Sequence, residues 1–271
     1  MKHDVIDGVV VRVRDMGDRD RYLSVLTAEK GRISLLSKGS RSMRGEQMAV
    51  SQLYTYANFE YYKKGDTYIL KGGSPIQPFY ALSMDIDRIN LAAYFCELVC
   101  ELTDEGEEAG QMLRLLLNAM YAVSRELYPQ EAIKAAFEMR AAVLSGYAPE
   151  PHGCAVCGAS NCDPMYLDVM NGALLCPDCL KQHGKRKEGG VYDEIREADV
   201  IAPLTPAALQ ALRYVCEAPL ERLFSFGLKD EEDMHLFAHA AEIYLLSHLG
   251  RGFDSLNFYH TMRKGAKGTD I

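Results

Sequence analysis

The sequence predicts an α+β protein in which a small N-terminal β-barrel precedes an all-helical domain that carries a four-cysteine module. Over the first 80 residues, apolar positions alternate with polar ones, as in half-buried strands. From Leu82 onward the apolar residues recur at helical spacing. Two Cys-x-x-Cys pairs stand near the middle of the chain. We therefore divide the chain into domains 1–80 and 81–271, with the cysteine module at about 150–190.

Short strands account for the first domain. Valines at odd positions from Val5 to Val13 keep a period of two and predict a first strand, with Arg12 and Arg14 on its other face. Five short strands in so few residues favour a closed barrel, and the OB-fold is the leading candidate. The further strands are expected at residues 22–27, 33–37, 53–62 and 67–71.

Helices account for most of the second domain. Ser83 is a possible N-cap for an apolar stripe that runs from Ile86 to Cys100. Thr205 and Pro206 form a favourable N-cap and N1 pair for a later helix. The polar tail from Lys264 to Ile271 is expected to be disordered. Further helices are expected at about 107–127, 130–145 and 230–249.

The cysteine pairs are Cys154 with Cys157 and Cys176 with Cys179. The 18 residues between the pairs are a spacing typical of zinc sites. Four thiolates complete a tetrahedron and leave no open position for a substrate, so we predict a zinc ribbon with one structural Zn²⁺. A redox dithiol or a disulfide pair is the alternative. Cys162 is not expected to be a ligand, because its distance from Cys157 lacks the Cys-x-x-Cys geometry.

Charge is distributed unevenly along the chain. The net charge of −8 at pH 7 argues against a uniformly basic nucleic-acid binder. Residues 1–80 nevertheless carry 13 Lys and Arg against 9 Asp and Glu, whereas residues 81–271 carry 17 against 29. From Lys30 to Arg44 there are five basic residues and no acidic one. We therefore expect the first domain to meet a polyanion and the second to repel one.

The basic loop from Lys38 to Arg44 combines Lys and Arg with Ser and Gly, the residue types that contact phosphates. The strand after it is aromatic, and alternation places Tyr54 and Tyr56 on its more polar face, where bases stack. The alternatives are an ordinary solvated loop and rings that pack against the barrel. The expected DNA-binding residues are Arg12, Arg14, Lys30, Arg32, Lys38, Arg41, Arg44, Tyr54 and Tyr56.

The sequence identifies no catalytic residue. It contains neither a Gly-x-x-x-x-Gly-Lys-Ser/Thr phosphate loop nor a Gly-x-Ser-x-Gly elbow. His235 and His239 stand four apart but lack the glutamate of a metalloprotease motif. No apolar run reaches the length of a membrane span, and the chain starts without a leader-like segment. We therefore expect a cytoplasmic protein that is not an enzyme.

Three segments, in their order along the chain, resemble the RecO family of bacterial recombinational-repair proteins. The first runs from Gly8 to Arg41 and resembles the opening strands and the basic Lys-Gly-x-Arg loop of the family. The second is 137–149, which looks like the family's helix ending in Gly-Tyr-x-Pro. The third comprises the two cysteine pairs, with Gly158 after the first. The resemblance covers about residues 5–250.

The resemblance implies an N-terminal OB-fold, a helical C-terminal domain and a zinc ribbon. It also implies a mediator that binds single- and double-stranded DNA, anneals complementary strands and helps RecA to load, without ATP hydrolysis. The implied partners are RecR and the acidic C-terminal tail of the single-stranded DNA-binding protein, with RecA met indirectly and no membrane. The implied location is the nucleoid-associated cytoplasm.

Two other functions are compatible with the same residues. The zinc module and the helices would also suit a protein-interaction adaptor that touches nucleic acid only incidentally. A zinc-dependent hydrolase is disfavoured, because four cysteine ligands leave no site for the attacking water.

Overall fold

The structure, a computed structural model, describes residues 3–41, 47–183 and 200–267. The chain forms two compact units, Met1–Leu127 together with Phe253–Ile271, and Tyr128–Gly252. The first unit contains the N-terminal strands, the helices that precede the second unit in the sequence and the helix that follows it. The domain boundary at residue 80 stays a prediction.

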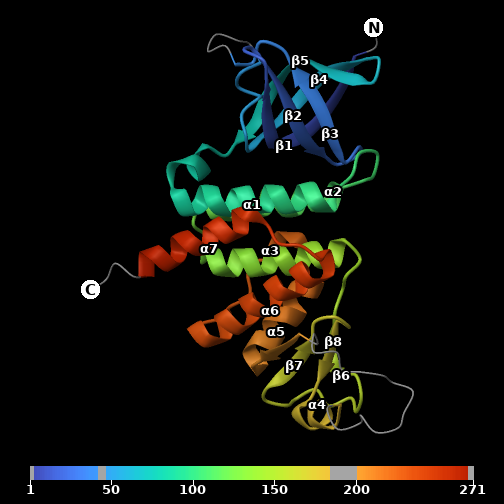
Figure 1. Ribbon diagram of the computed structural model, residues 1–271, viewed down its shortest axis with the longest axis vertical. Coiled ribbons are helices and arrows are strands. Elements are labelled where there is room, and N and C mark those ends of the chain that lie inside the picture. The colour runs from blue at the N-terminus through green and yellow to red at the C-terminus, as the bar shows by residue number, and fades with distance from the viewer. Residues whose placement is uncertain (1–2, 42–46, 184–199, 268–271) are drawn as a thin grey trace. The chain divides into compact units, whose positions relative to one another are not determined.

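Five strands of the first unit close into a barrel (Figure 1). Around the barrel they follow the order β1-β2-β3-β5-β4, in which β3 and β5 are parallel and the other neighbours are antiparallel. This topology confirms the small barrel of OB type that the sequence predicts. The strands are β1 (Asp4–Met16), β2 (Asp20–Thr27), β3 (Arg32–Ser37), β4 (Thr55–Lys64) and β5 (Thr67–Pro78).

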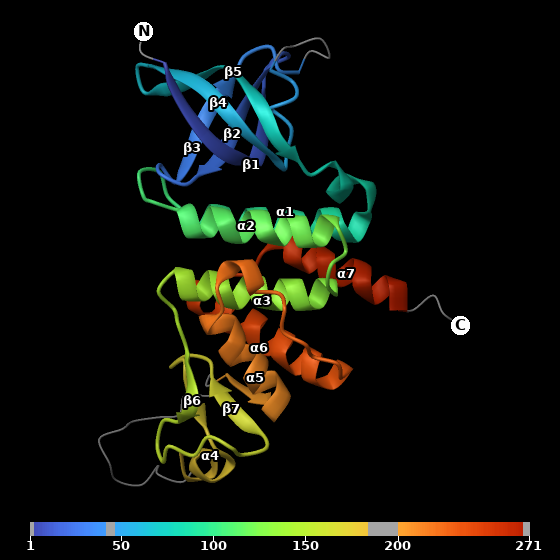
Figure 2. The ribbon, with the colours of Figure 1, turned by 180° about the vertical axis from the view of Figure 1, so that it is seen from behind.

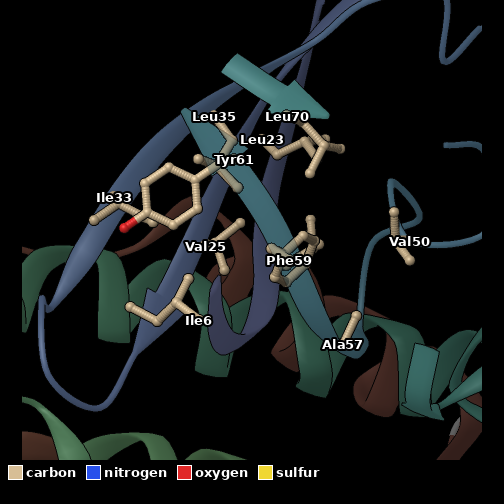
Figure 3. Close-up of a cluster of buried hydrophobic side chains, with 11 residues drawn as sticks. Ile6, Leu23, Val25, Ile33, Leu35, Val50, Ala57, Phe59, Tyr61 and Leu70 are labelled. Carbon is tan, nitrogen blue, oxygen red and sulfur yellow. The ribbon is translucent and has the colours of Figure 1, made fainter. Parts of the chain in front are cut away.

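Side chains from all five strands fill the barrel (Figure 3). The alternation is regular along β4, where Ala57, Phe59 and Tyr61 are buried and the residues between them are half-buried. Val50 reaches the same core from the segment between β3 and β4. Because successive side chains of a strand point to opposite faces, this inner set leaves the other residues of each strand on the outer surface.

The phase of the first strand differs from the prediction. Ile6 and Val10 lie in the barrel core, whereas Val5 is 62% exposed. A bulge between Val10 and Arg12 inserts one residue, after which Val13 packs against the core. The expectation of one face for all the odd-numbered valines is therefore wrong, because the inserted residue reverses the alternation.

Three helices of the first unit come directly after the barrel strands in the sequence, and a fourth is the last described element of the chain (Figure 2). Asp85, and not Ser83, caps the first helix, since its side chain accepts hydrogen bonds from the amides of Asp87 and Arg88. The expected disorder of the tail is wrong for Lys264–Lys267, which are helical. The remaining residues of that tail lie outside the described part of the chain. The elements are η1 (Tyr80–Met84), α1 (Ile86–Leu102), α2 (Gly110–Ser124) and α7 (Asp254–Lys267).

The second unit combines helices with a small sheet of strand order β6-β8-β7-β9. Thr205 caps its helix as expected, because its hydroxyl accepts a hydrogen bond from the amide of Ala208. The helical domain therefore also contains four short strands. The helices are α3 (Gln130–Leu144), α4 (Pro177–His183), α5 (Pro206–Glu217), η2 (Leu220–Arg222) and α6 (Glu231–Leu249). The strands are β6 (Glu150–Cys154), β7 (Met165–Asp168), β8 (Ala173–Leu175) and β9 (Ile201–Leu204).

Three charged side chains link α3 to α6 in the interior of the second unit. The Nζ of Lys134 lies 2.8 Å from Oε1 of Glu138 and 2.5 Å from Oε2 of Glu242. The side chains of Lys134 and Glu138 are 4% and 0% exposed. The pair with Glu138 lies within α3, and the pair with Glu242 joins the two helices.

Among the helices in the described ranges, none is both long and apolar enough to span a bilayer.

Candidate metal centre and nucleic-acid interface

The sheet of the second unit brings the two cysteine pairs together. Strand β6 ends at Cys154, and the amide of Gly158 then donates to the Cys154 carbonyl at 2.8 Å, which closes a tight turn. Gly158 has a φ of +76°, a conformation that favours glycine. Strand β8 leads to Cys176, and helix α4 carries Cys179 on its first turn. Two short local structures thus present one cysteine pair each.

The four sulfur atoms of Cys154, Cys157, Cys176 and Cys179 all lie within 4.8 Å of one another. Those of Cys157 and Cys176 are 3.7 Å apart. A tetrahedron with Zn–S bonds of about 2.3 Å has edges of about 3.8 Å, so these donors fit a tetrahedral metal. Among the residues that the structure describes, no other cluster of three or more His, Cys, Asp or Glu side chains has ligand geometry.

The thiols of this cluster differ in their ionisation. Burial raises the pKa of Cys154, but hydrogen bonds from the backbone at Cys176, Cys157 and Val156 outweigh it and lower the pKa to about 6. Hydrogen bonds with the side chains of Cys176 and Cys157 raise the pKa of Cys179. The lowered pKa of Cys154 favours its thiolate form, which a metal cation binds. Binding of the cation would also deprotonate the neighbouring thiols.

Cys162 lies near the cluster without being part of it. Burial and the charges of Cys176 and Cys157 raise the pKa of the Cys162 thiol. Its sulfur atom is not among the four that lie within mutual ligand distance. The expectation that Cys162 is not a ligand agrees with this geometry. The four cysteines are able to hold a metal ion.

The loop after β3 is fastened to the turn between β1 and β2. The amide of Gly39 donates to Oδ1 of Asp20 at 2.8 Å. A guanidinium nitrogen of Arg41 donates to the Gly17 carbonyl at 2.6 Å, and Nε of Arg41 lies 3.6 Å from Asp15. Lys38 projects from this loop as an exposed side chain. The hydrogen bonds thus hold Lys38 and Arg41 beside the β1–β2 turn.

Two basic residues of the predicted set have partners at another part of the barrel. Nζ of Lys30 donates to the hydroxyl of Tyr61 at 2.6 Å, and Nε of Arg32 donates to the Thr103 carbonyl at 3.2 Å. The acidic segment 104–108 is attached there, because the amide of Gly106 donates to the Lys30 carbonyl. Exposed carboxylates therefore surround this hairpin, which makes it a poor place for phosphate.

The predicted tyrosines have unequal access to solvent. Tyr54 precedes β4, has a φ of +62° and is 3% exposed, so the expected exposure of its ring is wrong. Its amide donates to the Val10 carbonyl, which turns the residue into the protein before the alternation of β4 begins. Tyr56 is half-buried. Burial, followed by the charges of Asp7 and Glu29, raises the pKa of its phenol.

Of the other predicted contacts, Arg12 and Arg14 are exposed on β1, and Arg44 lies outside the described residues. The basic residues at 185–187 after the second cysteine pair also lie outside them. Sequence reasoning missed Tyr22, whose ring lies under the Arg14 guanidinium. Its position opposite Arg14 depends on the β1–β2 register, which the bulge sets.

Comparison with known proteins covers both parts of the chain. The family model described as "Recombination protein O N terminal" matches residues 1–79, and the one described as "Recombination protein O C terminal" matches residues 83–257. Proteins named "DNA repair protein RecO" are similar over most of their length. That of Acetivibrio thermocellus is 28% identical over 94% of this chain and 95% of the relative, and that of Clostridium acetobutylicum is 24% identical over 93% and 91%.

A third relative of the same name, from Alkaliphilus metalliredigens, is 30% identical over 64% of this chain and 70% of its own length. The barrel matches the N-terminal model and the helices with the cysteine cluster match the C-terminal one. With both halves accounted for, the chain belongs to the RecO family of DNA repair proteins.

Proposed function

We propose that this protein is a recombination mediator that binds single- and double-stranded DNA, anneals complementary strands and helps RecA to load together with RecR. Membership of the family supports this function. The observation that carries it is the exposed basic surface around the β1–β2 turn, formed by Arg14, Lys38 and Arg41. Phosphate contacts of this kind supply most of the affinity of sequence-independent DNA binding.

The extent of the DNA surface follows from the local charge. Basic side chains at the β1–β2 turn outnumber the carboxylates there, whereas the hairpin that carries Lys30 and Arg32 holds the acidic segment 104–108. We therefore place the phosphate contacts at Arg14, Lys38 and Arg41. Arg12, also exposed on β1, acts electrostatically on Cys100 of α1 together with Arg32, so we do not include it in this surface.

A salt titration tests this function. Binding of a fluorescein-labelled oligo-dT is measured by anisotropy from low to moderate salt for the wild type and for the double variant Lys38→Gln, Arg41→Gln. We expect log K to fall with log salt, and the double variant to bind more weakly with a slope smaller by about 0.7 for each contact removed. Annealing of complementary strands is measured on the same proteins.

The matched control removes two positive charges elsewhere. Lys181 and Lys229 are both exposed, and the variant Lys181→Gln, Lys229→Gln should keep the wild-type slope. Wild-type affinity that stays constant across the salt series would exclude phosphate contact and with it the proposed function. Equal losses in both double variants would show a general charge effect instead of a site.

We further propose that the cysteine cluster holds one structural Zn²⁺ and that the protein is not an enzyme. Four sulfur ligands fill a tetrahedral zinc, so the ion would hold β6, β8 and α4 together and activate no water. The proposed partners include the acidic tail of the single-stranded DNA-binding protein, with RecA met indirectly. The proposed location is the nucleoid-associated cytoplasm.

A protein-interaction adaptor is the second candidate. Three large apolar side chains stand exposed at the beginning of the helical part, with Tyr80, Met84 and Ile86 at 58%, 85% and 54%. Apolar groups in such a position favour contact with another protein. Unchanged DNA affinity in the Lys38→Gln, Arg41→Gln variant would favour this adaptor over the DNA-binding mediator.

A further inference from the structure

Three side chains form a row across the outer face of the barrel. Arg14 on β1 lies opposite Tyr22 on β2, and Tyr22 lies opposite Leu36 on β3. Leu23, the residue after Tyr22, lies in the barrel core. Tyr22 therefore points outward, because successive side chains of a strand alternate between the two faces.

The Arg14 guanidinium lies over the ring of Tyr22, with its central carbon 5.7 Å from the ring centroid. Arg14 is exposed, and Tyr22 is half-buried beside the almost fully buried Leu36. Within residues 3–41, 47–183 and 200–267, Arg14 makes no ion pair, whereas Arg21 pairs with Asp15 at 3.0 Å. The planar Arg14 guanidinium thus lies over the Tyr22 ring, which has Leu36 beside it, and no described carboxylate pairs with this cation.

The surroundings of Tyr22 are basic. Arg14 lies opposite it on β1, and the loop of Lys38 and Arg41 follows β3, the strand that pairs with Tyr22 on its other side. Tyr56 differs, since its phenol is close enough to Asp7 and Glu29 for their charges to raise its pKa. Phosphates are therefore attracted to the neighbourhood of Tyr22 and repelled from that of Tyr56.

We propose that Arg14 and Tyr22 form a platform on which an unpaired base of single-stranded DNA stacks while Lys38 and Arg41 contact the flanking phosphates. Both the guanidinium plane and the aromatic ring are surfaces on which unstacked bases lie. A duplex keeps its bases stacked within itself, so the platform distinguishes single strands from double strands. This inference rests on the proposed DNA-binding function and names the residues that would recognise the base.

The experiment compares two ligands that carry the same phosphates. One is a fluorescein-labelled oligo-dT, and the other is a labelled abasic oligomer of equal length. We expect the wild type to bind oligo-dT more tightly. The variant Tyr22→Leu should lose about 5- to 150-fold in oligo-dT affinity, the range for one stacked base, and should bind the abasic oligomer as the wild type does.

Two further variants separate the ring from the guanidinium. Tyr22→Phe keeps the ring and should bind oligo-dT like the wild type. Arg14→Lys keeps the charge but loses the planar group, so oligo-dT affinity should fall while the salt slope is unchanged. If Tyr22→Leu does not fold, as judged by circular dichroism, the Arg14→Lys result alone decides. Tyr56→Leu is the matched control and should bind both oligomers normally.

The outcomes distinguish this platform from the function on which it rests. A wild type that binds neither oligomer would overturn the proposed function. A wild type that binds oligo-dT and the abasic oligomer equally would overturn the platform and leave the function standing. Equal losses on both oligomers in Tyr22→Leu, or a loss in Tyr56→Leu as large as in Tyr22→Leu, would also overturn it.

Discussion

At the scale of single residues, side chains of the same type differ in what their surroundings allow. Arg32 donates from Nε to the Thr103 carbonyl and lies beside an acidic segment, whereas Arg14 is exposed over an aromatic ring. Tyr54 is buried with its backbone in the left-handed region, and Tyr22 is half-buried on an outer face. Residue type alone therefore does not identify which side chains are suited to the proposed DNA contacts.

Gly31 is a residue that tolerates no side chain. Its φ is +59°, and a Cβ atom placed there would lie 2.0 Å from the Asp104 carbonyl oxygen. We expect Gly31→Ala to lower the free energy of unfolding by more than about 2 kcal/mol, because a backbone clash adds to the cost of the left-handed conformation. Urea denaturation followed by circular dichroism measures the change.

The control for Gly31 is Gly65, which has a φ of +61° and open space within 4 Å of the position that a Cβ atom would take. Gly65→Ala carries the conformational cost alone, about 1–2 kcal/mol. Equal destabilisation by the two substitutions would show that the contact between the β2–β3 hairpin and the segment after α1 is not tight.

At the scale of secondary-structure elements, the pairing of α3 with α6 depends on buried charge. Lys134 and Glu138 belong to α3, and Glu242 belongs to α6. Removing one partner of a buried ion pair leaves the other charge in a medium that solvates it poorly. We expect Lys134→Met to cost about 3–5 kcal/mol of unfolding free energy, whereas Lys229→Met on the surface should cost less than about 0.5 kcal/mol.

The contribution of Lys134 also depends on pH. Burial by itself lowers the pKa of this ammonium group, but the charges and hydrogen bonds of Glu138 and Glu242 outweigh burial and raise it above 10.5. A raised folded-state pKa stabilises the fold fully below the unfolded-state value and loses that effect as the pH rises through the folded-state value. On the alkaline side, the difference in unfolding free energy between the wild type and Lys134→Met should therefore shrink only above about pH 10.5. Unchanged stability of the variant at pH 7 would contradict the assigned role.

At the scale of the whole molecule, the four clustered cysteines belong to one compact unit and the proposed DNA contacts to the other. Structural zinc contributes on the order of 10 kcal/mol to the folding of small modules. Removal of the metal by a chelator, or by Cys176→Ser, should therefore accelerate hydrogen exchange at the amides of β6 and β8. The amides of β1–β5 should exchange as slowly as in the wild type. Mass spectrometry of peptic fragments measures the exchange of each strand separately.

The control for this experiment is Cys162→Ser, since Cys162 is near the cluster but outside its ligand geometry. It should retain about one zinc per chain by elemental analysis, whereas Cys176→Ser should lose it. Equal metal content in wild type and Cys176→Ser would refute the ligand assignment. Loss of protection throughout β1–β5 would show that the units do not unfold independently.

The local patterns of the sequence were sufficient for the barrel, the start of α5 and the cysteine cluster, but they placed the cap of α1 at Ser83 instead of Asp85. The Thr205 cap and the Cys-x-x-Cys turns involve residues at most four apart, so their geometry depends on local backbone preference. The phase of β1 was not predictable in this way. The bulge near Val10 is recognised only from pairing with β2, which is a contact between distant residues.

The sequence by itself determined that a barrel precedes helices, which four cysteines cluster, and the resemblance to the family, because each follows from spacing along the chain. Only the tertiary structure decided which basic and aromatic residues share a surface. It joined the segment 104–108 to the β2–β3 hairpin, buried Tyr54 and placed Arg14 over Tyr22. The physical reason is that charge and stacking act through space, so strand register and burial select the interacting residues.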